Sequence, residues 1–181
     1  IETSIDGKKL YCISLYSKNY KKSFIVSKNK FQNAVSCSNE ETLIENFQKA
    51  VILEDPDIIT GWNVIDFDLE FLKNKFEKYN IPFSLGRDNT VSKLDIQSNF
   101  FRDSKANIPG RQVIDGLILL KSSFIKLPDY KLDTVAQGIL GKQKLIADKS
   151  KIDQIYKDDP KLLLEYNLLD AELAYKIIIE G

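Results

Sequence analysis

Any chemistry in this chain has to come from carboxylates, tyrosine, lysine or bound metal, because none of its 181 residues is histidine. A Ser-His-Asp triad, a histidine-ligated zinc site and a histidine general base are therefore excluded. The two cysteines, Cys12 and Cys37, lack metal-ligand spacing and are expected to be buried free thiols.

Tyr166 and Asp170 stand four residues apart in an expected helix, so they share one face. Four apolar residues fall on the same side of that helix: Leu163, Leu173, Ala174 and Ile177. A carboxylate in an apolar stripe is costly to bury unless a cation or hydrogen-bond donors compensate it. The pattern leaves open a metal ion, a lysine partner or backbone amides at a helix crossing.

Asp68 is expected in the first turn of a helix over about 66–79. The simplest interpretation is a favourable interaction with the helix dipole, and Lys75 also falls near this face. Glu2, in a short terminal strand, would ordinarily be expected to be exposed.

The first part of the chain predicts strands followed by a helix. Strands are expected over 11–16 and 23–27, which with a stub at Ile1 suggest an antiparallel meander. Ser38 and Glu41 form a capping box that predicts the start of a helix, and Pro56 ends it.

The remainder alternates strands and helices. A buried parallel strand is expected over 57–62 and another strand over 111–115, with an irregular or hairpin insertion at about 84–110 between them. Helices are expected over 117–125, 131–140, 151–157 and 160–179. This order predicts an α/β fold with a mixed central sheet flanked by helices, which fits the ribonuclease H-like architecture.

Length and composition limit what else the chain can be. The length suits one domain over residues 1–181, no apolar run is long enough to cross a membrane, and no signal peptide is evident. The absence of methionine suggests a fragment of a longer protein. Acidic and basic residues balance at 26 each, which argues against a large basic surface for duplex DNA.

Three stretches resemble the exonuclease motifs of family B DNA polymerases. Residues 63–68 resemble the second motif, with Asn, a short spacer, an aromatic residue and Asp. Residues 166–170 resemble the third, and residues 1–3 resemble the first, Asp-Ile-Glu-Thr, without its leading Asp. Residues 55–63, 85–89, 135–137 and 140–141 also look like the bacterial DNA polymerase II branch, so the resemblance spans nearly the whole chain.

The resemblance implies a 3′→5′ proofreading exonuclease domain, cut from a larger polymerase, that hydrolyses the last phosphodiester of single-stranded DNA with two Mg²⁺ or Mn²⁺ ions. It implies that Glu2 and Asp170 bind the ion that activates water, Asp68 holds the second ion, and Tyr166 orients the water. The missing Asp would bridge both ions, so the chain as written is expected to have little or no activity.

The same resemblance implies substrate contacts. Thr3 and Asn63 would touch the terminal nucleotides, and Phe67 and Phe71 would pack against their bases, although core packing is the preferred interpretation for Phe71. Lys144 lies near a phosphate-contacting position of some relatives, but a solvated loop lysine is the preferred alternative.

The implied partners are a single-stranded DNA 3′ end and the polymerase domains of the same polypeptide, with no membrane, in a bacterial cytoplasm near the nucleoid. One rival hypothesis is a non-catalytic exonuclease-like scaffold or template-binding domain, favoured if a residue other than Asp precedes Ile1. The other is a stand-alone RNA-trimming nuclease of the same superfamily, which the insertion at 84–110 speaks against.

Overall fold

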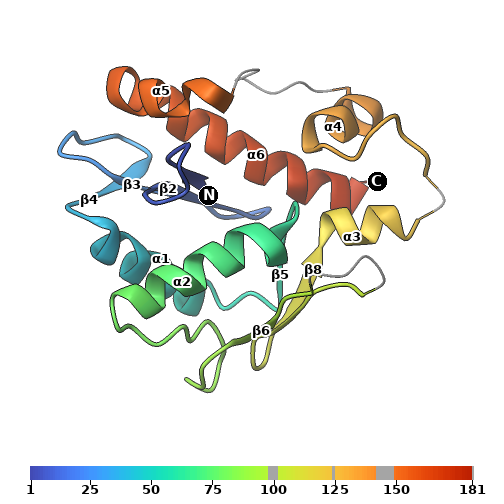
Figure 1. Cartoon of the computed structure of the whole chain (residues 1–181), viewed down its shortest axis with the longest axis horizontal. Helices are drawn as coiled ribbons and strands as arrows, with labels where there is room; N and C mark the ends of the chain where they lie inside the picture. The colour runs from blue at the N-terminus through green and yellow to red at the C-terminus, as the bar shows by residue number, and fades with distance from the viewer. Residues whose placement is uncertain (98–101, 124, 142–148, 181) are drawn as a thin grey trace. The chain divides into compact units, whose positions relative to one another are not determined.

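The computed structural model describes residues 1–97, 102–123, 125–141 and 149–180. Its contacts divide the chain into two compact units. The first unit comprises Ile1–Leu43 with Leu127–Gly181, and the second comprises Ile44–Lys126. Each has its own strands and helices (Figure 1). The single domain over 1–181 stays a prediction.

The first unit contains a four-stranded sheet in the order β1-β2-β3-β4. Its strands are β1 (Glu2–Thr3), β2 (Leu10–Tyr16), β3 (Lys21–Val26) and β4 (Ala34–Cys37). The first three pair antiparallel, as the sequence predicted, and β4 pairs parallel with β3, so the sheet is mixed. The strand β4 was not predicted, because it is a short run of mostly small residues.

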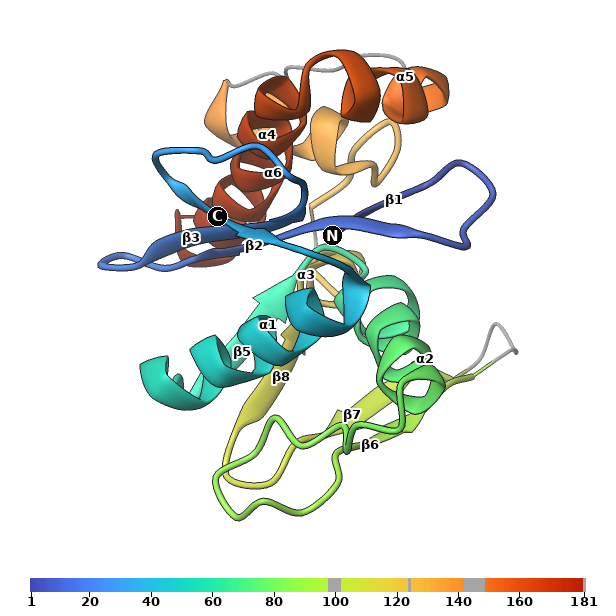
Figure 2. The same cartoon turned by 90° about the vertical axis from the view of Figure 1, so that its left-hand side faces the viewer.

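The helices α4 (Leu132–Leu140), α5 (Ile152–Asp158) and α6 (Pro160–Glu180) belong to the first unit, as does the short 3-10 helix η2 (Lys149–Lys151). The long α6 packs on β2 and β3, and Figure 2 shows it lying along one face of these strands. The predicted apolar stripe of α6 is buried, since its four members are at most 4% exposed. Burial of each leucine or isoleucine of the stripe stabilises the fold by roughly 1.5–3 kcal/mol.

Aromatic residues anchor α5 to the strands. The rings of Tyr11 and Tyr156 stack with centroids 3.8 Å apart, and the Tyr156 hydroxyl donates to the Val26 carbonyl at 2.5 Å. The Tyr11 hydroxyl donates to Asp153 at 3.1 Å, and the same carboxylate oxygen accepts from the Ile5 amide at 3.0 Å. Burial, with the bond to Asp153 and its charge, raises the pKa of Tyr11 to about 12.

Both cysteines are buried and free, as predicted. Cys12 lies in the core cluster of the first unit, and burial raises the pKa of its thiol well above the ordinary value. Neither thiol has the exposure that reactive cysteines require.

The helix α1 (Glu40–Glu54) begins one residue later than the predicted capping box implies. The carboxamide of Asn39, not the hydroxyl of Ser38, accepts from the Thr42 amide at 2.8 Å, so the prediction of Ser38 as the cap was wrong. The helix ends as expected before Pro56, with Asp55 in the left-handed region (φ 44°).

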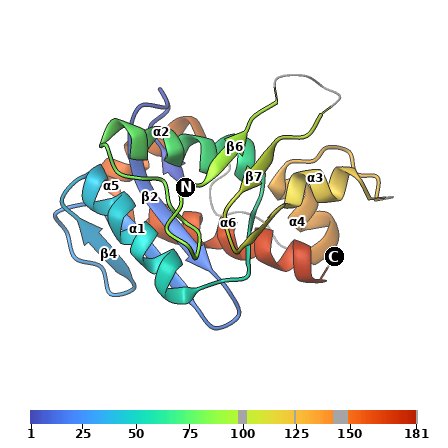
Figure 3. The same cartoon turned by 90° about the horizontal axis from the view of Figure 1, so that it is seen from below.

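The second unit contains two pairs of strands. β5 (Ile58–Gly61) pairs parallel with β8 (Gln112–Asp115), which leads into α3 (Gly116–Lys121). β6 (Lys93–Asp95) pairs antiparallel with β7 (Lys105–Asn107), and Figure 3 shows these two strands side by side. The described strands therefore form three separate sheets rather than one.

The expected α-helix over 66–79 is two elements. A π-helix, η1 (Val64–Leu69), precedes α2 (Glu70–Lys78). A hydrophobic pattern of six residues does not distinguish the two helix types, which is why the prediction was wrong here. The helix expected over 117–125 is also shorter, because α3 ends at Lys121.

The structure is thus α/β, with a mixed sheet and helices. Among the residues that it describes, none of the helices combines the length and hydrophobicity needed to cross a membrane.

We expect alkaline pH to destabilise the protein partly through Tyr11. Its pKa is about 12 in the folded protein and near 10 in an unfolded chain, so the stabilising protonated form is fully populated below about pH 10 and is lost as pH rises through about 12. Tyr11→Phe should therefore flatten the decline in the free energy of unfolding over this window. Urea unfolding of both proteins at several pH values tests this, and equal slopes would contradict it.

Candidate active site

The first unit brings Glu2, Tyr166 and Asp170 together. Strand pairing places Glu2 opposite Cys12 on β2, where it is only 8% exposed rather than exposed as a terminal residue would be. Because α6 packs on β2, the fully buried Tyr166 lies close enough to Glu2 for the two to interact electrostatically.

The residues at the start of α6 fix where this helix begins. Asp159 caps it, since its carboxylate accepts from the Leu162 amide at 3.0 Å, and Pro160 occupies the first helical position. The acidic cap and the proline fix the first residue of the helix. They therefore also fix which of the later residues face the sheet.

Tyr166 is held as a neutral hydrogen-bond donor. Burial raises its pKa far above the ordinary 10, and the negative charges of Asp170 and Glu2 raise it further. Its hydroxyl also makes a side-chain hydrogen bond to Asp170. The phenol therefore stays protonated at any physiological pH.

Asp133, which was not predicted as a site residue, also raises the pKa of Tyr166 through its charge. It lies in the first turn of α4, which packs against α6. No pattern along the sequence signals this proximity, because it depends on how two helices pack.

The donor set around Tyr166 suits a hard cation. Glu2 is buried, and so is Oδ1 of Asp170. Burying two carboxylates near each other is costly, and a divalent cation with oxygen ligands would offset that cost. Oδ1 of Asn167 is also buried and accepts no hydrogen bond within the described part of the chain. Over the described ranges, however, no three acidic or cysteine side chains are arranged so that they could hold a metal ion.

The second unit carries the other predicted motif. Asn63 adopts the left-handed conformation (φ 56°, ψ 35°), which asparagine tolerates better than most residues, and η1 follows directly. Within η1, Phe67 is 46% exposed and Asp68 is half-buried. Phe71 is half-buried, with Nζ of Lys75 5.2 Å from its ring centroid.

Thr3 lies in β1 and is half-buried, and its hydroxyl donates to the Ser4 carbonyl at 3.2 Å. Lys144 lies outside the described residues. The predicted site residues thus fall into two groups. Glu2, Thr3, Tyr166 and Asp170 belong to the first unit, and Asn63, Phe67, Asp68 and Phe71 belong to the second.

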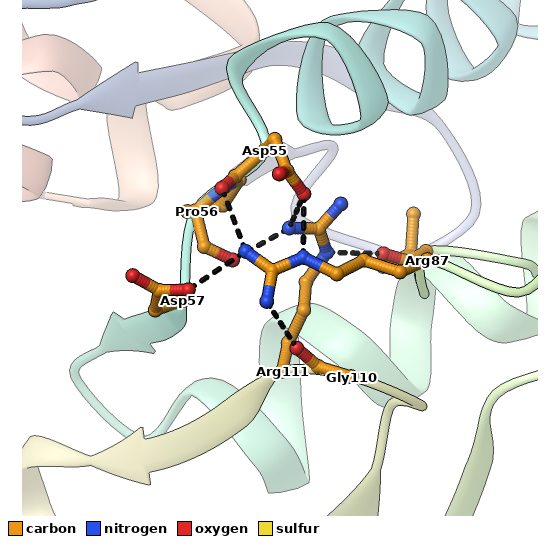
Figure 4. Close-up of polar contacts among 7 residues, drawn as sticks. Asp55, Pro56, Asp57, Arg87, Gly110 and Arg111 are labelled. Atoms are coloured by element: carbon orange, nitrogen blue, oxygen red, sulfur yellow. Dashed lines mark hydrogen bonds and ion pairs between the residues drawn. The ribbon is translucent and has the colours of Figure 1, made fainter.

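A second charged cluster, in the second unit, serves the fold. The guanidinium groups of Arg87 and Arg111 converge on Asp55, at 2.7 and 2.9 Å (Figure 4). Arg111 also donates to the Leu85 and Pro56 carbonyls at 2.7 and 2.5 Å, and its side chain is 1% exposed. The arginines hold the pKa of Asp55 below its usual value. The charged groups of this cluster satisfy one another's hydrogen bonds, so the cluster holds the loops that carry them in place.

The comparisons with known proteins now define the class. Residues 6–135 match the family described as DNA polymerase family B, exonuclease domain. The chain belongs to this family, which confirms the resemblance seen in its motifs.

Individual relatives are longer polymerases. DNA polymerase II of Escherichia coli is 35% identical over 98% of this chain, which covers 24% of that protein. A DNA polymerase of Methanocaldococcus jannaschii is 33% identical over 77% of this chain and 8% of its own length. The DNA polymerase delta catalytic subunit of Caenorhabditis elegans is 28% identical over 81% of this chain, which covers 14% of that protein. The chain therefore spans a quarter or less of each relative.

We expect Arg111→Lys to lower the free energy of unfolding by roughly 2–4 kcal/mol, because lysine cannot replace the three hydrogen bonds of a buried guanidinium. Arg87→Lys is the matched control, since Arg87 contacts the same carboxylate but is 39% exposed, and it should have a much smaller effect. Chemical denaturation measures both. Equal losses would show that burial of Arg111 is not what matters.

Proposed function

We propose that this chain acts as a 3′→5′ exonuclease domain that removes nucleotides from single-stranded DNA ends, as part of a longer family B polymerase. One observation carries the proposal. A neutral, buried Tyr166 is surrounded by the carboxylates of Asp170 and Glu2, in a chain that belongs to this exonuclease family. The ribonuclease H-like architecture is part of the same proposal.

Exonuclease domains of this family generally use divalent metal ions. In the proposed arrangement Glu2 and Asp170 hold one ion and Asp68 holds the second, each Mg²⁺ or Mn²⁺. When bound, such ions supply positive charge that lowers the pKa of the attacking water and offsets charge on the leaving 3′-oxygen.

Tyr166 then orients the water. Its hydroxyl donates to Asp170, which leaves the phenolic oxygen lone pairs to accept a hydrogen bond from the attacking water. Because its raised pKa keeps it neutral, Tyr166 fixes direction and does not remove the proton.

The proposed substrate contacts involve the residues predicted from the sequence. Phe67 is exposed enough to stack on a base, and stacking holds a single strand without reading its sequence, which suits proofreading. Asn63 and Thr3 contribute polar contacts to the terminal nucleotides. Phe71 packs beneath Lys75 and supports the helix more than the substrate.

The partners in this proposal are a DNA 3′ end and the polymerase domains of the same polypeptide. The similarity to an Escherichia coli relative favours a bacterial cytoplasmic protein. If Asp precedes Ile1 in the full-length protein, it would complete the first motif and would be a further carboxylate ligand for the ions.

We expect Asp68→Ala and Asp170→Asn, made in the full-length protein, to reduce Mg²⁺-dependent digestion of a 3′-labelled single strand by more than about 100-fold, because changes one shell further from a metal already cost 10- to 100-fold. Asp66→Ala is the matched control, since this exposed aspartate lies two residues from Asp68 in the same π-helix. It should digest normally.

Robust digestion by either variant would exclude the proposal. A wild-type protein with no exonuclease activity on DNA or RNA ends would instead favour a non-catalytic scaffold, and a preference for RNA ends would favour the RNA-trimming alternative.

Metal binding can be tested apart from activity. Asp170→Asn removes the charge of a proposed ligand and keeps the size of its side chain. Mn²⁺ should raise the melting temperature of the wild type and have little effect on the variant, because a ligand stabilises only the state that binds it. Thermal melts with and without Mn²⁺ measure both effects. Equal stabilisation by Mn²⁺ would count against Asp170 as a ligand.

A further inference from the structure

Asp115 is a buried carboxylate that the proposed chemistry does not use. It is the last residue of β8, caps the N-terminus of α3, and is 5% exposed. Its Oδ1 accepts from the Leu117 amide at 2.9 Å and, more weakly, from the Ile118 amide at 3.4 Å. A helix cap of this kind needs only one side-chain oxygen.

The second oxygen serves a different helix. Oδ2 of Asp115 accepts from the Ile65 amide at 3.1 Å, in a fully buried hydrogen bond across 50 residues of sequence. Ile65 is the second residue of η1, where amides have no acceptor within their own helix. One carboxylate therefore closes the first turns of both α3 and η1.

The start of η1 needs such an anchor. π-helices are rare and are found mostly at functional sites. Asn63, which precedes η1, makes no side-chain cap for it and holds a left-handed backbone. The turn is also tight, because a Cβ added at Gly61 would lie 3.0 Å from the Val64 side chain.

The parallel pairing of β5 and β8 explains why Asp115 can supply the anchor. The register sets Gly61 opposite Asp115, so the carboxylate emerges beside the point where the chain leaves β5 for η1. The preceding pair reinforces this register, since the Thr60 hydroxyl donates to the Ile114 carbonyl at 2.6 Å.

We infer that Asp115 is the positioning residue for Asp68, fixing the first turn of η1 so that the Asp68 carboxylate, three residues beyond Ile65, is held where it binds metal. This inference rests on the proposed function, in which Asp68 is a metal ligand. Asp115 itself touches neither metal nor DNA.

The test separates positioning from general stability. Asp115→Asn keeps one oxygen but sets an NH₂ group against a backbone amide, and Asp115→Ser keeps a cap for α3 but loses the second acceptor. The control is Leu120→Ala. Leu120 lies in α3 and is 7% exposed, so its truncation destabilises the unit without removing a bond to η1. All are made in the full-length protein.

The measurement is exonuclease rate against Mn²⁺ concentration, with melting temperatures in parallel. We expect both Asp115 variants to need roughly tenfold more Mn²⁺ for half-maximal rate, with most of the rate recovered at saturation. Leu120→Ala should keep the wild-type Mn²⁺ requirement even if it melts as early as they do. If Asp115→Asn does not fold, the Mn²⁺ requirement of Asp115→Ser tests the inference.

Asp68→Ala in the same assay distinguishes the two hypotheses. If it is inactive at every Mn²⁺ concentration while the Asp115 variants keep the wild-type requirement, the positioning role is overturned and the proposed function stands. If Asp68→Ala digests DNA normally, the proposed function itself fails.

Discussion

The constraint on which the first unit depends is the burial of negative charge beside a tyrosine. Glu2 is almost fully buried, Asp170 has a buried oxygen, and both charges act on Tyr166. Such an arrangement disfavours folding by itself, so the packing of α6 on the sheet has to offset it. In the proposed function, a bound divalent cation would offset part of this cost.

The buried charges of the second unit behave differently, and the contrast separates structural from functional groups. Arg111 donates to two carbonyls and to Asp55, and Asp115 accepts from three amides, so each is satisfied mainly by backbone that is present in any folded state. Groups of this kind define loop and helix geometry. The carboxylates of Glu2 and Asp170 instead act on one neutral hydroxyl, and both raise the pKa of Tyr166.

The sequence predicted the elements whose signals are local. The periodicity and cap of α6 and the alternation of β2 and β3 were sufficient, because each element buries one face. Features that depend on contacts remote in sequence were missed. Asp115 carries a recognisable helix-cap signal, but its bond to Ile65 arises only from the register of β5 and β8. The motifs likewise named the candidate residues, and whether the two groups converge stays a prediction.

The second motif lies on a π-helix where the sequence pattern predicted an α-helix. The buried residues of η1 are Val64, Ile65 and Leu69, with spacings of one and four that an α-helix would also place on one side, so the pattern did not distinguish the two helix types. Phe67 faces solvent, and its neighbour Asp68 stays half-buried. In the proposed function, η1 therefore places an exposed ring that can stack on a base next in sequence to the carboxylate that would bind metal.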